Sequence, residues 1–317
     1  MSDFPKENYS TKLSNVFISK LKSYGLDSEI SLIIRKEKNQ YLYDIDMNKY
    51  TDFFLNNGSV IVGHNNKVLT KYIKNAISIG TENVFLNKFY YKLVRLFSSI
   101  TSIKNIGFYT SIFFAFYEIL KNNSFKSIGV NSSYLFNLLK VYFPDLNIVY
   151  PIKRKVVDLF IFEPLEFDNN LEITDFKNVK AKKYCSYEGR TFFRINQGFF
   201  YSIDVVDYVL AGNIIANGMD TAVLISKESL KTQIIPSYLS VAILETIKYY
   251  IRKKIEFPTF NYDFVKSQKG GILKLNHQIE LKEFLKKGVF LIGDVAFLSI
   301  FHTEHDLKRL EKAINKN

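Results

Sequence analysis

Side chains that could carry chemistry are scattered along this 317-residue sequence and follow no metal-binding pattern. His64, His302 and His305 lack the spacing of zinc ligands, so no metal site is expected. Cys185 is the one cysteine, which excludes an intrachain disulfide and a cysteine metal cluster and suits a reducing compartment. A lone buried cysteine is more often inert packing than a nucleophile. Hydrolytic or metal-assisted chemistry is therefore not indicated.

A different chemistry is suggested by the segment Leu210-Ala211-Gly212-Asn213-Ile214-Ile215-Ala216-Asn217-Gly218. It resembles the segment that carries the Schiff-base lysine in class III pyridoxal-phosphate-dependent aminotransferases, where the pattern reads Leu-Gly-Lys-Ile-Ile-Gly-Gly-Gly. Asn213 stands at the lysine position. An amide cannot form an aldimine with an aldehyde cofactor, because this covalent chemistry needs a free amine. The segment thus implies a relationship to this family, but its asparagine argues against covalent binding of the cofactor.

Other blocks, in the same order as in the family, resemble its glutamate-1-semialdehyde aminomutase branch. Tyr41 to Phe53, with the later Gly63-His64, is similar to a Tyr-x-x-Asp-x-Asp-Gly-x-x-Tyr-x-Asp run followed by Gly-His. Asp158 to Pro164 matches a strand that ends in Glu-Pro. His302-Thr303-Glu304 with Asp306 is similar to a C-terminal His-Thr-x-x-Asp. The collinear order implies a fold-type I transferase.

The positions that hold the cofactor in the family are altered. Phe108 to Ala115 corresponds to a Phe-x-Asn-Ser-Gly-Thr-Glu-Ala turn that grips the cofactor phosphate at a helix N-terminus. Ser111 matches, but Ile112 and Phe113 replace the Gly-Thr pair, so bulky apolar groups obstruct the phosphate and a hydroxyl donor is lost. The block Tyr187-Glu188-Gly189-Arg190-Thr191-Phe192-Phe193-Arg194 resembles Asp-Glu-Val-Met-Thr-Gly-Phe-Arg of the family. Tyr187 thus replaces the aspartate that pairs with the pyridinium nitrogen, and a neutral phenol is a poor counter-ion.

Three further positions remain family-like: Glu163, Glu188 and Thr232. Without a cofactor, the two glutamates would satisfy buried backbone groups or pair with Arg194. Thr232 matches a threonine that reaches the phosphate of the neighbouring subunit. No catalytic residue is assigned, and the remnant cofactor-binding positions are Ser111, Ile112, Phe113, Glu163, Tyr187, Glu188, Asn213 and Thr232.

Together these replacements predict a pseudoenzyme of the class III type, with no covalently bound cofactor and with a binding or assembly role. The alternative is an active pyridoxal-phosphate-dependent aminotransferase or aminomutase that acts on an amino acid or amino sugar. The family dimerises with both active sites at the interface. The resemblance therefore implies a homodimer, or a heterodimer with an active paralogue.

The composition excludes several other classes. Lysine and arginine number 43 against 31 acidic residues, giving a net charge of +12 that is spread over short clusters and is typical of a solvated basic surface. Nucleic acid is not expected as a partner, because no finger, RNA-binding signature or long basic tail is present. No uncharged run is long enough to cross a membrane, and the first residues lack the apolar core of a signal peptide. A cytoplasmic, membrane-free protein is expected.

The elements that would position these residues follow from hydrophobic periodicity. Tyr41 to Asp46 and Tyr50 to Phe54 are predicted to form a hairpin, and a helix is predicted from Asn66 to Gly80. Further helices are expected at Phe113 to Lys121, at Leu239, Ile243, Ile247, Tyr250 and Ile251, and after a capping box of Thr303 and Asp306. Val156 to Phe162 is predicted to form a buried strand of a parallel sheet, and residues 288–293 are predicted to form a short strand.

Alternating strands and helices predict an α/β domain with a mostly parallel sheet over residues 81–244. Residues 1–80 and 245–317 are expected to form a smaller α+β domain from the two chain ends.

Overall fold

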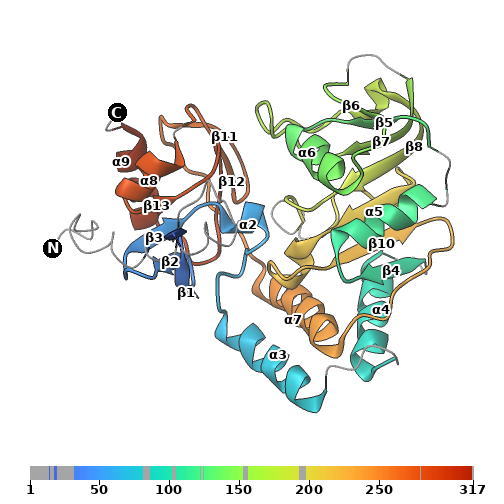
Figure 1. Cartoon of the computed structure of the whole chain (residues 1–317), viewed down its shortest axis with the longest axis horizontal. Helices are drawn as coiled ribbons and strands as arrows, with labels where there is room; N and C mark the ends of the chain where they lie inside the picture. Colours follow the sequence, from blue (N-terminus) through green and yellow to red (C-terminus); the bar gives the residue numbers. More distant parts are fainter. Residues whose placement is uncertain are drawn as a thin grey trace.

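The computed structural model describes residues 14, 18–19, 32–80, 86–101, 105–121, 123, 125–152, 156–192, 198–278 and 280–315. They form two lobes, and α7 and α3 lie low in the view of Figure 1. The larger lobe contains a seven-stranded sheet in the order β4-β10-β9-β8-β7-β5-β6. Its strands are β4 (Ile106–Tyr109), β5 (Ile128–Val130), β6 (Ile148–Val149), β7 (Val156–Phe162), β8 (Lys180–Tyr187), β9 (Tyr208–Ala211) and β10 (Ala222–Ser226).

The predicted mostly parallel sheet is confirmed. The strands from β9 through β8, β7 and β5 to β6 pair in parallel, whereas β10 runs antiparallel to both β9 and β4. The strand predicted at Val156 to Phe162 is β7, which pairs with β8 through Phe160 opposite Tyr184 and Ile161 opposite Cys185. Its apolar run suits a strand that is covered on both faces.

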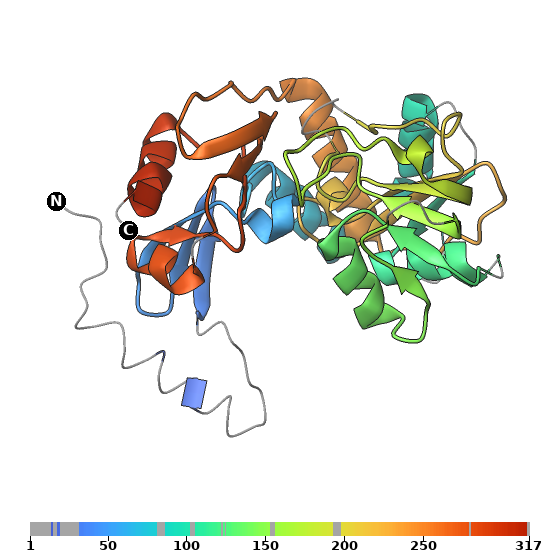
Figure 2. The ribbon, with the colours of Figure 1, turned by 90° about the horizontal axis from the view of Figure 1, so that it is seen from above.

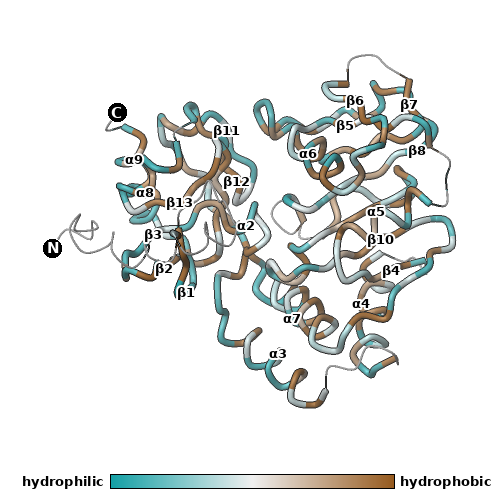
Figure 3. Tube along the Cα trace, viewed as in Figure 1, coloured by the Kyte–Doolittle hydropathy of each residue, from teal (hydrophilic) through white to brown (hydrophobic). Residues whose placement is uncertain are grey.

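Helices cover both faces of this sheet. Figure 3 shows apolar stretches, in brown, in both strands and helices of this lobe. On one face, α4 (Lys88–Thr101) and α7 (Ser237–Lys253) pack their apolar side chains against Phe108, Phe160 and Val223. On the other face, α5 (Ile112–Lys121) and α6 (Ser133–Tyr142) pack against Leu159 and Ile161. Two short 3-10 turns, η1 (Phe176–Asn178) and η2 (Asn213–Ala216), lie in the connections.

The smaller lobe joins the two ends of the chain (Figures 1 and 2). One sheet contains β1 (Ile34–Lys38), β2 (Tyr41–Asp44), β3 (Lys49–Asp52) and β13 (Val289–Phe290), and β3 pairs with β13 in parallel. A second sheet contains β11 (Val265–Lys269), β12 (Ile272–Leu275) and β14 (Val295–Phe297). Helices α8 (Leu281–Lys286) and α9 (Glu304–Asn315) belong to this lobe, while α2 (Leu55–Gly58) and α3 (Lys67–Ile79) lead into the larger one.

Most predicted elements are present with shifted ends. The hairpin is β2 and β3, but the return strand ends at Asp52 rather than Phe54, because the Asp52 carboxylate accepts the backbone N–H groups of Phe54 and Leu55. The predicted C-terminal strand shortens to β13. The capping box is present in one direction, since the Asp306 carboxylate accepts the backbone N–H of Thr303 at 2.9 Å.

Two predicted helices bury a narrower stripe than expected. In α3, Asn66 caps the N-terminus and Gly80 follows the last residue, as predicted. Leu69 and Ala76 are buried against α7, but Tyr72 and Ile77 are about half exposed, because α3 packs on a single helix. In α7, Leu239, Ile243, Ile247 and Tyr250 are buried whereas Ile251 is 48% exposed.

The predicted domain limits lie between residues 80 and 81 and between residues 244 and 245. Residue 81 lies outside the described residues, and the limit between residues 244 and 245 falls inside α7, which packs on the larger lobe. None of the helices in the described part of the chain combines the length and apolarity needed to cross a bilayer.

Candidate ligand-binding cleft

A cavity of about 560 Å³ lies where the larger lobe meets the smaller one. Its wall on the larger lobe is built by residues at or just after the carboxyl ends of strands: Ile112 after β4, Ser133 after β5, Tyr187 at the end of β8 and Asn213 after β9. This edge of an open α/β sheet is where ligands bind in such folds. The smaller lobe contributes Phe54, Asn56, Asn57, Ser59, Ile292, Gly293, Asp294, Val295 and Phe297.

Three positions that the sequence singled out from separate blocks meet in this cavity. Ile112, Tyr187 and Asn213 all line it. The other remnant positions are not among the lining residues: Ser111, Phe113, Glu163, Glu188 and Thr232. The structure therefore brings together the altered phosphate-loop, ring-nitrogen and lysine positions.

Asn213 begins the 3-10 turn η2 directly after β9. Its carbonyl oxygen accepts the Gly218 N–H at 2.9 Å, and its side-chain oxygen lies 3.5 Å from the Thr221 N–H. The turn ends at Asn217 and Gly218, both with positive φ, and a Cβ at residue 218 would lie 2.8 Å from Val60 of the smaller lobe. The glycine is therefore needed for close approach of the two lobes.

Tyr187 occupies the floor of the cavity and is only 4% exposed. Its ring stacks on Tyr134 at 6.3 Å, and burial above all raises the pKa of its phenol well above the ordinary value, so the phenol is neutral. A Cβ at residue 189 would lie 2.1 Å from the Tyr187 hydroxyl. Gly189 stands where the family pattern has valine. The tyrosine thus fits only because residue 189 has no side chain.

Ile112 and Tyr187 both reach the backbone beside Asn213. A Cβ at Gly212 would lie 3.2 Å from Ile112 Cδ1 and 3.5 Å from the Tyr187 hydroxyl. These two side chains therefore fill space next to Asn213, which the resemblance places at the lysine position.

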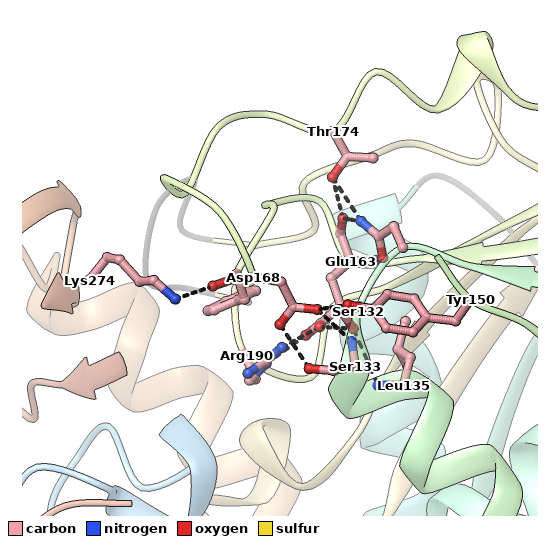
Figure 4. A network of polar contacts seen from close by, with 11 residues as sticks. Ser132, Ser133, Leu135, Tyr150, Glu163, Asp168, Thr174, Arg190 and Lys274 are labelled. Carbon is pink, nitrogen blue, oxygen red and sulfur yellow. Dashed lines mark hydrogen bonds and ion pairs between the residues drawn. The ribbon is translucent and has the colours of Figure 1, made fainter. Parts of the chain in front are cut away.

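Arg190, a lining residue of the cavity, belongs to a buried ion pair (Figure 4). The Arg190 guanidinium donates to both oxygens of the Glu163 carboxylate, with Nε 2.6 Å from Oε1, and both residues are buried. The Ser132 hydroxyl donates to Glu163 Oε2 at 2.6 Å. The guanidinium lies 3.7 Å over the Phe167 ring and 4.6 Å over the Tyr134 ring.

Glu163 pairs with Arg190. Arg194, the partner that the sequence offered for the glutamates, lies outside the described residues. The sequence had indicated no role for Arg190. The available signal was the arginine itself, at a position where the family pattern has methionine.

Asp168 and Lys274 extend this network across the cleft. Asp168 accepts the Ser133 N–H at 2.6 Å, the Ser133 hydroxyl at 2.9 Å and the Tyr150 hydroxyl at 2.6 Å. Burial raises the pKa of Asp168, but these hydrogen bonds outweigh burial and hold the pKa below its usual value. Lys274 from β12 donates to the Phe167 carbonyl at 2.8 Å and pairs with Asp294 at 2.7 Å.

Glu188 lies behind the cavity and satisfies buried backbone groups, which is the other alternative that the sequence left open. Its carboxylate accepts the N–H groups of Phe200 at 2.5 Å and Tyr201 at 3.0 Å, and the Ser186 hydroxyl at 3.1 Å. Burial raises the pKa of Glu188 to about 8, against the lowering effect of these donors. Its role in this chain is to organise the loop before β9.

The remaining remnant positions are structural. Phe113 stacks on Phe143 at 5.3 Å on the outer side of α5. Thr232 accepts the Phe108 N–H at 2.9 Å and lies 2.8 Å from the Tyr90 hydroxyl, so it joins α4 to β4. Ser111 lies in the turn between β4 and α5, beside Thr110, whose N–H donates to Gln233.

The other chemically capable residues do not line the cavity. Cys185 is fully buried in β8, and burial raises the pKa of its thiol. His64 lies between two carboxylates, with Nε2 2.7 Å from Asp52 and Nδ1 2.9 Å from Glu37. Among the described residues, no group of three histidine, cysteine or acidic side chains is arranged to hold a metal ion.

Comparison with known proteins supports the sequence resemblance. No protein-family model matches the chain. Glutamate-1-semialdehyde 2,1-aminomutase of Wigglesworthia glossinidia brevipalpis is 35% identical over 89 residues, which cover 28% of this chain. The match spans only 20% of that relative's length.

Solved structures match over almost the whole chain. Ornithine δ-aminotransferase of Plasmodium falciparum has a TM-score of 0.67 at 14% identity, covering 95% of this chain and 97% of that one. Acetylornithine aminotransferase of Elizabethkingia anophelis has a TM-score of 0.66 at 13% identity, with 96% and 99% covered. A transaminase with bound pyridoxal phosphate has a TM-score of 0.70 at 10% identity, with 96% of each covered.

These structural likenesses establish that the chain has the fold of the pyridoxal-phosphate-dependent aminotransferases. Together with the glutamate-1-semialdehyde aminomutase match, they confirm its resemblance to the class III family.

Proposed function

We propose that this chain is a pseudoenzyme of the class III aminotransferase type, which binds a ligand non-covalently in the cleft where its relatives hold their cofactor. The observation that carries this proposal is the meeting of Ile112, Tyr187 and Asn213 in one cavity. Each replaces a different part of the cofactor machinery. An amide offers no amine, a neutral phenol offers no negative charge, and an isoleucine at the glycine position obstructs a phosphate with its side chain.

The residues of this cavity do not fit pyridoxal phosphate. The lining residues, all within the described part of the chain, include no lysine. Lys274 is the nearby candidate from the smaller lobe, but its ammonium group is held by Asp294 and the Phe167 carbonyl. Lys227 and Lys231 are exposed and do not line the cavity. The lining therefore offers no amine for a covalent link to the cofactor.

Absorbance spectroscopy with added pyridoxal phosphate tests the proposal. The wild-type protein is expected to give only the spectrum of the free aldehyde. Asn213→Lys restores an amine but not the phosphate grip, so this variant is expected to show neither a stable aldimine band nor transamination. Asn137→Lys, which places a lysine elsewhere on the cavity wall, is the matched control.

Two results would contradict the proposal. A stable aldimine band and amino-group turnover by the wild type would establish the alternative, an active aminotransferase or aminomutase. Turnover by Asn213→Lys but not by Asn137→Lys would mean that the phosphate site is intact despite Ile112.

A further inference from the structure

The charges around the cavity are unevenly distributed. Two ion pairs are internally neutral: Arg190 with Glu163, and Lys274 with Asp294. Two carboxylates of the lining remain outside these pairs, Asp168 and Asp220. The cavity therefore carries a negative charge, although the whole chain carries +12. Carboxylates in a partly enclosed site attract cations and repel a phosphate dianion.

Asp220 is the carboxylate available to a ligand. Asp168 already accepts three hydrogen bonds from Ser133 and Tyr150, whereas the described residues supply no hydrogen bond or ion pair to the Asp220 side chain. Asp220 is exposed at the mouth of the cavity, and partial burial of its carboxylate raises its pKa with no hydrogen bond or charge of the described residues to oppose the rise. A cationic group beside it would relieve this cost.

The rest of the lining suits an amine with hydroxyl groups. Tyr134 and Tyr142 offer aromatic faces, which attract ammonium groups. Four asparagines, Asn56, Asn57, Asn137 and Asn213, bring amide groups that both donate and accept hydrogen bonds. Tyr187, almost fully buried, adds a neutral hydroxyl at the floor.

The rim that presents two of these amides has an unusual backbone. Leu55, Asn56 and Asn57 have φ of 49°, 50° and 53°, and Gly58 continues the left-handed run. Consecutive left-handed residues other than glycine are costly and are kept where the surrounding structure holds them. Here Asp52 accepts the N–H groups of Phe54 and Leu55, and the Asn56 amide donates to the Gly218 carbonyl at 3.4 Å.

We infer that the cleft binds a small hydroxylated organic amine in its protonated form, with the ammonium group at Asp220 and the hydroxyl groups at the asparagine amides. This inference rests on the proposed function, because it requires a cleft without covalent cofactor. An amino sugar such as glucosamine has this chemistry, and glucose is its matched neutral analogue.

Isothermal titration calorimetry of the full-length protein at pH 6, where the amine is protonated, tests the inference. The probes are glucosamine, glucose and inorganic phosphate. Glucosamine is expected to bind at least tenfold more tightly than glucose, and phosphate is expected not to bind. Asp220→Asn is expected to weaken glucosamine binding about threefold to fivefold, as loss of one charge pair at an exposed position does.

Asp204→Asn is the control for removal of one exposed acid far from the cavity, and it is expected to leave binding unchanged. Equal binding of glucose and glucosamine, absence of glucosamine binding, or equal loss in Asp220→Asn and Asp204→Asn would overturn the inference. The pyridoxal phosphate spectrum separates the two failures. A cleft that binds neither amine nor cofactor refutes only the ligand class, whereas an aldimine band refutes the proposed function itself.

Discussion

At the scale of single residues, the cavity shows substitutions that depend on one another. Tyr187 stands where the family pattern has aspartate, and Gly189 stands where it has valine. The Tyr187 phenol could not keep its position if residue 189 had a Cβ, because that atom would lie 2.1 Å from the Tyr187 hydroxyl. The larger residue at one position therefore requires the smallest at the other.

This dependence can be measured by a double-mutant cycle. Gly189→Ala is expected to lower the free energy of unfolding by about 1–3 kcal/mol, because it forces a buried ring to move. The same change in a Tyr187→Leu background is expected to cost much less, since leucine does not reach residue 189. Urea unfolding of the four proteins gives the coupling energy. Equal costs in both backgrounds would show that the two residues are independent.

Arg190 shows the second dependence, on a carboxylate 27 residues earlier in the chain. Arg190→Met restores the family residue but leaves Glu163 buried without its cation. Breaking a buried pair from one side costs about 3–5 kcal/mol. The variant is expected to lose that much stability in urea unfolding at pH 7. Arg190→Met combined with Glu163→Gln should recover part of the loss; if the double variant is no more stable than Arg190→Met, charge is not the cause.

At the scale of elements, the left-handed turn of α2 depends on a histidine from the following loop. His64 contacts Asp52, and the other oxygen of Asp52 holds the first N–H groups of the turn. Burial lowers the pKa of His64, but the hydrogen bonds and charges of Asp52 and Glu37 outweigh burial and raise the pKa to about 9. The protonated imidazole therefore supports the cavity rim.

This arrangement predicts a pH dependence of stability. Because the pKa is raised in the folded protein above its unfolded value of about 6.5, the contribution of His64 is fully present below pH 6.5. It is lost as the pH rises through about 9. The difference in free energy of unfolding between wild type and His64→Gln is expected to be largest at pH 6 and to shrink by pH 9.5. A difference that stays constant over this range would exclude the charged form.

Helices and strands of this chain could be predicted where the local sequence pattern agrees with the packing of the element in the fold. The continuous apolar run of β7 predicts a buried parallel strand, and Asn66 and Gly80 fix both ends of α3. The hairpin end was wrong by two residues because Asp52 turns its carboxylate back onto the backbone, an interaction that alternation does not reveal. The family resemblance had assigned Ile112, Tyr187 and Asn213 to one cofactor site, and all three line the cavity.

The remaining parts of the site needed the structure because they join distant segments. The Arg190–Glu163 pair, the contact of Lys274 with the Phe167 carbonyl and the place of Asp220 on the cavity wall each depend on how loops pack across the cleft. Similar acidic and basic residues occur throughout the sequence, so residue type alone does not single them out.

At the scale of the whole molecule, one face of the larger lobe exposes aromatic side chains. Phe114 and Tyr117 of α5 are 40% and 49% exposed, and they adjoin the Phe113–Phe143 stack. Contiguous apolar surface of this kind marks protein interfaces. Tyr142, which also contacts Phe113, lines the cavity, so this face borders the cleft.

We therefore propose that the chain forms a homodimer through this face, as the family resemblance implies. A twofold interface would place each aromatic patch against the same patch of the second copy.

Light scattering at micromolar concentration is expected to give twice the mass of one chain. Phe114→Asp with Tyr117→Asp is expected to give a folded monomer, because the two side chains are 40% and 49% exposed in the single chain. Val205→Asp, which replaces an exposed apolar residue just before β9, should leave the dimer intact. A monomeric wild type across the micromolar range would refute the dimer, and a dimer that survives the double substitution would place its interface elsewhere.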